Sequence, residues 1–212
     1  MFIEILISNV NHPILKDLQD WSLDRKKLGD QVTIVHSSRD LSGGDFLFLV
    51  SCTEIIKEKI LEKFKFSLVL HASDLPEGKG WSPHVWNILE GKDCLIVSLL
   101  NAASKVDAGD IWLKIRIPLE GHELFDEINK KLFVAELELM SKAVDRFDEI
   151  IPAMQVKTQV KYYPKRTPED SRLDPNKSFI QQFNLLRIAD DQRYPAFFEH
   201  LGCKYIVTIK KG

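Results

Sequence analysis

The sequence contains 212 residues, of which 44% are hydrophobic and 28% are charged, as is usual for a globular protein with a full core. Lysine and arginine (29 residues) nearly balance aspartate and glutamate (31 residues), and the net charge of −2 disfavours binding to nucleic acid through a broad basic surface. No apolar run approaches the length of a membrane span, and the amino terminus lacks the layout of a signal peptide, so we expect no membrane partner.

The chain begins with segments that alternate between strand-like and helix-like patterns. Residues 2–8, 31–37, 46–50 and 66–70 are rich in β-branched and aromatic residues and are predicted to form strands. Helical spacing predicts one helix from about Pro13 to Gly29 and a second, capped by Thr53, that runs through Phe64. This order predicts a Rossmann-like α/β fold with a predominantly parallel sheet and helices on both faces. A G-x-G-x-x-G motif and a Walker A motif are absent from the sequence, so dinucleotide or nucleoside-triphosphate binding of the familiar kind is not indicated.

His71 directly follows the apolar run 66–70, so its imidazole is expected at the carboxyl end of a strand, where open α/β sheets bind ligands. A second apolar run, residues 94–100, leads to Asn101 and then to a turn that contains Asp107 and Asp110. The two strand ends are therefore expected to bring His71 and Asp107 together. The alternative is structural, because a histidine at a strand end commonly satisfies backbone groups and aspartate favours turns for local reasons. We assign the turn role to Asp110.

Residues 74–83 are predicted to form a loop in which two glycines, Gly78 and Gly80, permit unusual backbone conformations. Trp81 in this loop is a candidate lid or stacking surface, whereas Trp86, in a short helix over residues 85–89, is expected in the core.

The rest of the chain adds a strand, a long helix and a polar region. Residues 111–117 alternate as a half-exposed strand, and an amphipathic helix follows from Leu124 to about Phe147. Proline, lysine, arginine and aspartate are concentrated in residues 155–177, which we predict to be a loop ordered by contacts. A helix over residues 179–189 and a last strand over residues 203–210 complete a small carboxyl-terminal α+β subdomain. The predicted domains are residues 1–150 and 151–212.

The three cysteines, Cys52, Cys94 and Cys203, are far apart in the sequence and lie in apolar surroundings. They indicate reduced core thiols rather than a disulfide framework, and no cysteine or histidine spacing indicates a metal site. We therefore expect a cytoplasmic protein that binds no metal.

The motif order His71-x-Ser-x-Leu-Pro, a glycine-containing loop, Trp86, Gly91 and Asp107-x-Gly-Asp-Ile resembles the 10-formyltetrahydrofolate-dependent formyltransferases. This superfamily includes methionyl-tRNA, glycinamide ribonucleotide and sugar N-formyltransferases, and the resemblance covers residues 1–147. In the tail, residues 165–171 (KRTPEDS), 184–187 (NLLR) and 194–197 (YPAF) are similar to enzymes that formylate amino sugars on nucleotide carriers. The resemblance implies formyl transfer from 10-formyltetrahydrofolate to the amine of a nucleotide-linked amino sugar, for polysaccharide or glycan synthesis. The first 150 residues would then be the catalytic domain.

The resemblance also implies a catalytic trio of asparagine, histidine and aspartate, in which His71 and Asp107 match the last two members and Val69 replaces the asparagine. Attack of an amine on a formyl carbon places negative charge on oxygen, which an imidazolium can stabilise, and positive charge on nitrogen, whose proton a carboxylate can take. A protonated His71 needs a nearby anion, and Asp107 is the obvious one. The formyl oxygen needs a further donor, and we expect Asn101 rather than Ser98 or a backbone N–H to supply it.

Further residues are candidates for binding, and the resemblance places the pterin at the loop after a central strand. The pterin of the folate would lie along the loop after a central strand and along the segment before Asp107, at Val50, Ser51, Cys52, Ile55, Ala103 and Ser104. The amine substrate would contact Ser73, Lys79, Gly80, Trp81, Ser82, Pro83 and Arg166. For Lys79 and Arg166, a phosphate contact competes with an ordinary solvated charge.

Two alternatives stay open at this point. The acceptor amine could be that of methionyl-tRNA, although we see no counterpart of the larger RNA-binding domain that usually accompanies that activity. The missing asparagine also allows a folate-binding protein that has lost turnover. A homodimer is possible in either case.

Overall fold

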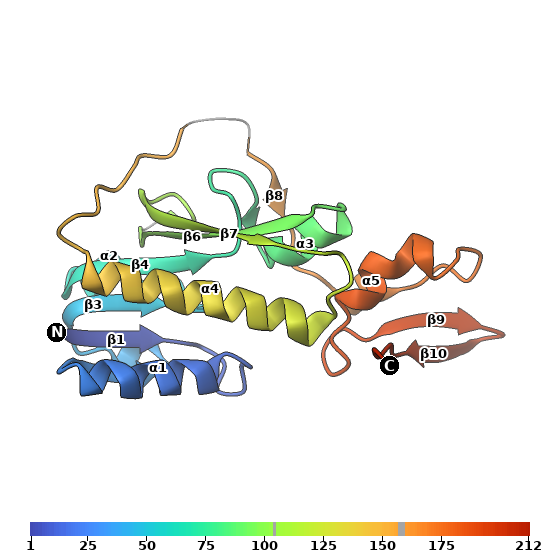
Figure 1. Ribbon diagram of the computed structural model, residues 1–212, viewed down its shortest axis with the longest axis horizontal. Coiled ribbons are helices and arrows are strands. Elements are labelled where there is room, and N and C mark those ends of the chain that lie inside the picture. Colours follow the sequence, from blue (N-terminus) through green and yellow to red (C-terminus); the bar gives the residue numbers. More distant parts are fainter. Residues whose placement is uncertain (104, 157–159) are drawn as a thin grey trace.

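The computed structural model describes residues 1–103, 105–156 and 160–212, and it shows an open sheet with helices packed against it (Figure 1). The main sheet has six strands in the order β2-β1-β3-β4-β6-β7. Their bounds are β1 (Phe2–Leu6), β2 (Gln31–Val35), β3 (Gly44–Leu49), β4 (Phe64–His71), β6 (Cys94–Asn101) and β7 (Ile111–Pro118). The first four strands pair in parallel, whereas β6 runs antiparallel to both β4 and β7. The prediction of a Rossmann-like, predominantly parallel sheet is confirmed.

Two long helices, α1 (Leu15–Lys27) and α4 (Phe125–Asp145), pack on one face of the sheet, and α4 crosses in front of the strands in Figure 1. Because neighbouring strand residues point to opposite faces, Leu68 and Leu70 enter the core beneath these helices while Val69 faces the other side. On that other side lies the short helix α2 (Glu58–Leu61), whose Leu61 packs in the second apolar cluster. Helices therefore lie on both faces, as predicted.

The second predicted helix is much shorter than expected. The segment before α2 is held by tertiary hydrogen bonds: the Thr53 N–H donates to the Ser8 hydroxyl at 3.0 Å, and the Glu54 carboxylate accepts from the Ser38 hydroxyl at 2.6 Å. These contacts keep residues 51–57 out of helical conformation, and Ile55, expected on the buried face, is 77% exposed. The predicted helix over residues 53–64 is therefore wrong outside α2.

Part of the polar region returns to the large domain. The strand β8 (Tyr162–Tyr163) pairs in parallel with β5 (Lys79–Gly80), just before the helix α3 (Pro83–Leu89), and Ala153 forms a bridge with Ile111 of β7. Two parts of this region, at Ala153 and at β8, therefore contact the large domain. The boundary at residue 150 stays a prediction.

The carboxyl-terminal subdomain lies at one end of the molecule, to the right in Figure 1. Its elements are η2 (Pro168–Ser171), η3 (Ile180–Gln182), α5 (Phe183–Arg187) and an antiparallel hairpin of β9 (Ala196–His200) and β10 (Cys203–Val207). The predicted helix over residues 179–189 is thus two short pieces, and β9 was not expected. All three cysteines are free, as predicted, but Cys203 lies exposed on β10 and is not a core thiol. Among the described residues, no helix combines the length and the apolar character needed to cross a membrane.

Candidate active site

His71 is the last residue of β4 and lies at the carboxyl edge of the parallel part of the sheet. Its side chain is buried, and strand alternation places it on the same face as Val69. The Nδ1 atom lies 3.4 Å from Oδ1 of Asp107, and Nε2 lies 3.1 Å from the carbonyl oxygen of Gly78. The two ring nitrogens of His71 therefore face two oxygen acceptors, one from a side chain and one from the backbone.

Asp107 reaches His71 by a different route from the one that the sequence suggested. Because β6 is antiparallel to β4, its carboxyl end lies beside Leu68 rather than beside His71. The chain then runs back across the sheet, beginning with a hydrogen bond of 2.7 Å from the N–H of Ala102 to the carbonyl of Ser67. Asp107 sits in this returning loop with a φ of +53°, and its Oδ2 accepts from the N–H of Gly80 at 3.2 Å. The predicted proximity of the two residues is therefore seen, although two parallel strand ends do not produce it.

The expectation that Asn101 donates to the pocket is wrong. Asn101 pairs with Leu68, so its side chain shares the face of Leu68 and lies on the opposite side of the sheet from His71. Its Oδ1 accepts a hydrogen bond of 2.7 Å from the indole N–H of Trp112. The register and the reversed direction of β6 are the physical reason, because they pair Asn101 with Leu68, and the sequence pattern of a buried strand reveals neither.

The glycine loop supplies backbone groups to both members of the pair. Gly80 has a φ of +100°, and a Cβ at this position would lie 2.3 Å from the carbonyl oxygen of Tyr163. Only glycine therefore allows β5 to approach β8 this closely while its N–H reaches Asp107.

The residues expected to bind the folate belong to two segments, one after β3 and one after β6. Val50 is fully buried, whereas Ser51, with a φ of +44°, and Ile55 are exposed. Cys52 is half-buried and packs in one apolar cluster with Val69 and Ala102 on the face of His71. Ala103 is exposed, and Ser104 lies outside the described residues.

The residues expected to bind the amine substrate occupy several environments. Trp81 is 40% exposed, and its ring centroid lies 5.0 Å from Nζ of Lys165. Lys79 is half-buried. Ser82 precedes α3 in a left-handed conformation with a φ of +46°, and Pro83 is the buried first residue of that helix.

Ser73 and Arg166 differ from the simplest expectation for polar residues, because both are buried. The carbonyl of Ser73 accepts from the hydroxyl of Ser98 at 2.7 Å, while its own hydroxyl has no partner among the described residues. Arg166 donates to the hydroxyl of Ser171 at 2.9 Å, but its Nε has no partner within the same residues. Arg166 is therefore not an ordinary solvated charge.

His84 in α3 is a residue of this region that the sequence did not single out. Burial, followed by the positive charges of His71, His12, Arg166 and Arg193, lowers the pKa of His84 to about 4. These side chains come from four separate segments that lie near His84 in the fold. No spacing in the sequence could have shown this gathering.

A histidine and an aspartate in contact at the carboxyl edge of a mostly parallel sheet define an α/β protein with a site for proton transfer and charge stabilisation. The formyl transferase family matches residues 9–144, more than half of the chain and the part that holds this pair. The chain belongs to the formyl transferase family.

Individual proteins show the same likeness. Methionyl-tRNA formyltransferase of Streptococcus gordonii is 27% identical over 147 residues, which are 68% of this chain and 47% of the relative. The chain thus spans about half the length of that relative. HypX of Aquifex aeolicus in complex with tetrahydrofolic acid superposes with a TM-score of 0.80 at 20% identity, covering 98% of this chain and 37% of that one. A sugar N-formyltransferase from a Shewanella species has a TM-score of 0.72 at 14% identity, covering 100% of this chain and 98% of that one. At these identities the two structures show a shared fold.

Proposed function

We propose that this protein transfers the formyl group of 10-formyltetrahydrofolate to the amine of a nucleotide-linked amino sugar. The observation that carries the proposal is the contact of 3.4 Å between His71 and Asp107, inside the segment that matches the formyl transferase family. Both groups are nearly excluded from water, which strengthens their electrostatic effect on a reacting group.

The chemistry follows from the properties of the two groups. The amine attacks the formyl carbon, a new C–N bond forms, and the imidazolium of His71 stabilises the negative oxygen of the tetrahedral intermediate. Asp107, directly or through water, accepts the proton of the attacking nitrogen. The bond between the formyl carbon and N10 of the folate then breaks, and the proton passes to N10. Nε2 of His71 must exchange the carbonyl of Gly78 for the formyl oxygen during this sequence.

The residues beside His71 fit a folate. Cys52, Val69 and Ala102 form an apolar surface on the same face as the imidazole, and Ile55, three residues after Cys52 in the same segment, leaves its side chain exposed. A flat pterin ring can bury this surface on binding. HypX, with the same fold, was solved with tetrahydrofolic acid, and this supports the assignment.

Arg166, whose guanidinium carries a permanent positive charge, leaves its buried Nε without a partner among the described residues, and a phosphate oxygen would satisfy that nitrogen. The tail motif 165–171, which includes Arg166, also resembles enzymes that act on nucleotide-linked amino sugars. Methionyl-tRNA is the second candidate, because the curated relative at 27% identity is a methionyl-tRNA formyltransferase.

The test incubates the full chain with 10-formyltetrahydrofolate and a panel of nucleotide amino sugars, and it measures the mass gain of one formyl group. His71→Asn and Asp107→Asn should each lower kcat by roughly 100- to 1000-fold while the protein stays folded. Near-normal turnover in either variant would refute the mechanism. Folate binding without any turnover on the sugars or on methionyl-tRNA would instead support the alternative of an inactive folate-binding protein.

A homodimer and a cytoplasmic location are also proposed. The exposed Tyr205 and Ile206 on β10, the outer strand of the two-stranded hairpin, support self-association. The free cysteines support a reducing compartment. A single mass for the monomer in light scattering at high concentration would contradict the dimer.

A further inference from the structure

Gln155 holds the turn that carries Asp107, although it lies beyond the segment that matches the formyl transferase family. Its amide nitrogen Nε2 lies 3.1 Å from the carbonyl oxygen of Asp107 and 2.8 Å from the carbonyl oxygen of Gly109. A primary amide has two N–H donors, so it can donate one hydrogen bond to each oxygen. One side chain therefore spans the turn from Asp107 to Gly109.

The turn needs such support because of its backbone conformation. Asp107 has a φ of +53°, in the left-handed region that a residue with a side chain keeps only when its surroundings hold it there. The base of the loop is fixed independently, because the N–H of Asn101 donates to the carbonyl of Asp110 at 2.8 Å. The tip is different, since Lys105 and Val106 are exposed. Gln155 thus holds the backbone of the turn directly after these exposed residues.

Gln155 is itself anchored to the main sheet. Two residues earlier, Ala153 exchanges two backbone hydrogen bonds of 2.8 Å with Ile111, the first residue of β7. Its neighbours Met154 and Val156 are 83% and 69% exposed, whereas Gln155 is half-buried and points its amide to the turn. The sheet is therefore the rigid support from which the amide reaches the loop.

We propose that Gln155 is a positioning residue, which fixes the Asp107 turn and so keeps the carboxylate of Asp107 against the imidazole of His71. Its predicted effect on rate depends on the proposed formyl transfer, but its effect on the geometry of the pair does not. Without the amide, the turn can leave the left-handed conformation and carry the carboxylate away from Nδ1 of His71. A displacement of about 1 Å can lower a rate by as much as ~100-fold.

Two variants and one control test the proposal in the full-length protein. Gln155→Met keeps the volume of the side chain and removes both donors. Gln155→Glu keeps the shape, but an ionised carboxylate cannot donate to the two carbonyl oxygens and repels them. Met154→Ala changes the exposed neighbour and serves as the control.

The measurements separate positioning from general stability. Both Gln155 variants should lower kcat by roughly 10- to 100-fold with KM within about twofold of wild type, because the substrate contacts are unchanged. In NMR spectra, the Cε1–H signal of His71 should move toward its position in the Asp107→Asn variant. Met154→Ala should match wild type in both measurements.

The outcomes are distinct. Wild-type kcat in Gln155→Met, or a loss of kcat with an unmoved His71 signal, would overturn the proposal, even if the melting temperature falls. If Gln155→Met does not fold, the same two measurements on Gln155→Glu decide. If wild type shows no formyl transfer at all, the proposed function fails, while the NMR comparison still decides whether Gln155 positions the pair.

Discussion

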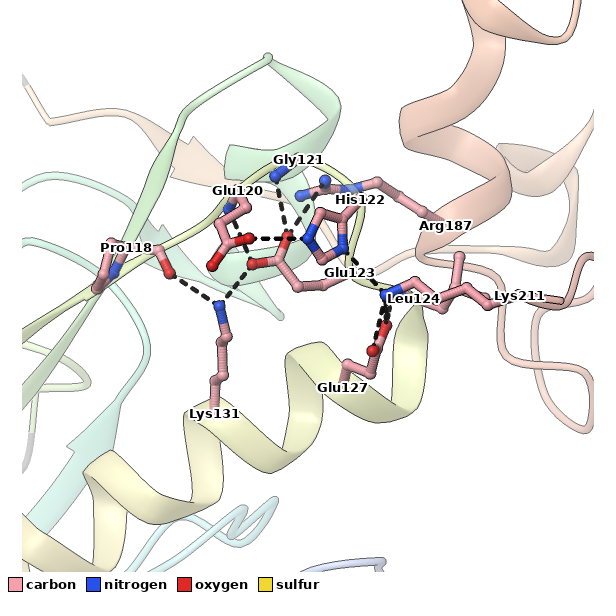
Figure 2. Close-up of polar contacts among 10 residues, drawn as sticks. All are labelled: Pro118, Glu120, Gly121, His122, Glu123, Leu124, Glu127, Lys131, Arg187 and Lys211. Carbon is pink, nitrogen blue, oxygen red and sulfur yellow. Dashed lines mark hydrogen bonds and ion pairs between the residues drawn. The ribbon is translucent and has the colours of Figure 1, made fainter.

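Glu123 tests how the carboxyl-terminal subdomain is attached to the part of the chain that contains the main sheet. Figure 2 shows its carboxylate in the loop before α4, where it meets Lys131 of α4 and Arg187 of α5. Oε1 accepts from Lys131 at 2.6 Å and from the N–H of Glu120 at 2.8 Å, and Oε2 lies 3.7 Å from Nη1 of Arg187. Both Glu123 and Arg187 are 2% exposed. The contact is therefore a buried ion pair between the two parts of the chain.

The magnitude of the effect follows from the pKa of Glu123. Burial raises this pKa, but the hydrogen bonds from Lys131 and from backbone N–H groups outweigh it and lower the pKa from 4.5 to about 2. The difference corresponds to about 3 kcal/mol of folding free energy. Because the folded pKa is lowered, this contribution is present above about pH 4.5 and is lost as the pH falls through about 2.

Glu123→Gln removes this contribution and leaves the buried Arg187 without its counter-ion, so we expect a loss of about 3 to 5 kcal/mol at neutral pH. In a chain of this size that is a fall in Tm of roughly 10 °C. Denaturant and thermal unfolding between pH 3 and pH 8 measure it, and the variant should also lose part of the acid sensitivity of the wild type.

The control is Glu127→Gln, the same substitution at an exposed carboxylate that contacts Lys211 in Figure 2. Solvent and salt screen an exposed ion pair, so the effect of this substitution on stability should be small. The double variant Glu123→Gln with Arg187→Met should regain part of the lost stability, because no uncompensated charge is then buried. Equal losses in Glu123→Gln and Glu127→Gln would refute the reasoning.

Three further predictions concern other buried positions. Burial raises the pKa of Glu136 from 4.5 to about 8, so its contribution to stability is present below about pH 4.5 and is lost as the pH rises through about 8. Glu136→Gln should flatten the fall of the unfolding free energy over this pH range. An unchanged slope would contradict the raised pKa. Gly80→Ala should lower kcat at least tenfold, since the new Cβ would lie 2.3 Å from the carbonyl oxygen of Tyr163 and displace the N–H that binds Asp107. Wild-type values in steady-state kinetics would exclude a role of the Gly80 N–H in holding Asp107. Val69→Asn should lower Tm without raising kcat, because it places an amide in the apolar cluster with Cys52 and Ala102; a gain in rate would show that the position can still act as the family's asparagine does.

The sequence alone determined the features that depend on local pattern. Alternating and helical periodicities located all six strands of the main sheet and both long helices, because these elements bury continuous apolar faces. The position of His71 directly after an apolar run placed it at a strand end, and the motif with Asp107 indicated the family that residues 9–144 match.

Tertiary structure decided the direction of β6 and everything that follows from it. A buried strand has the same pattern in either direction, so only pairing showed that Asn101 lies on the face away from His71 and that Asp107 returns through a loop. The helix predicted after Thr53 was shortened by hydrogen bonds to loops distant in sequence. The contacts of Gln155, His84 and Glu123 likewise join segments far apart in the chain, and side-chain chemistry of this kind leaves no periodic signal in the sequence.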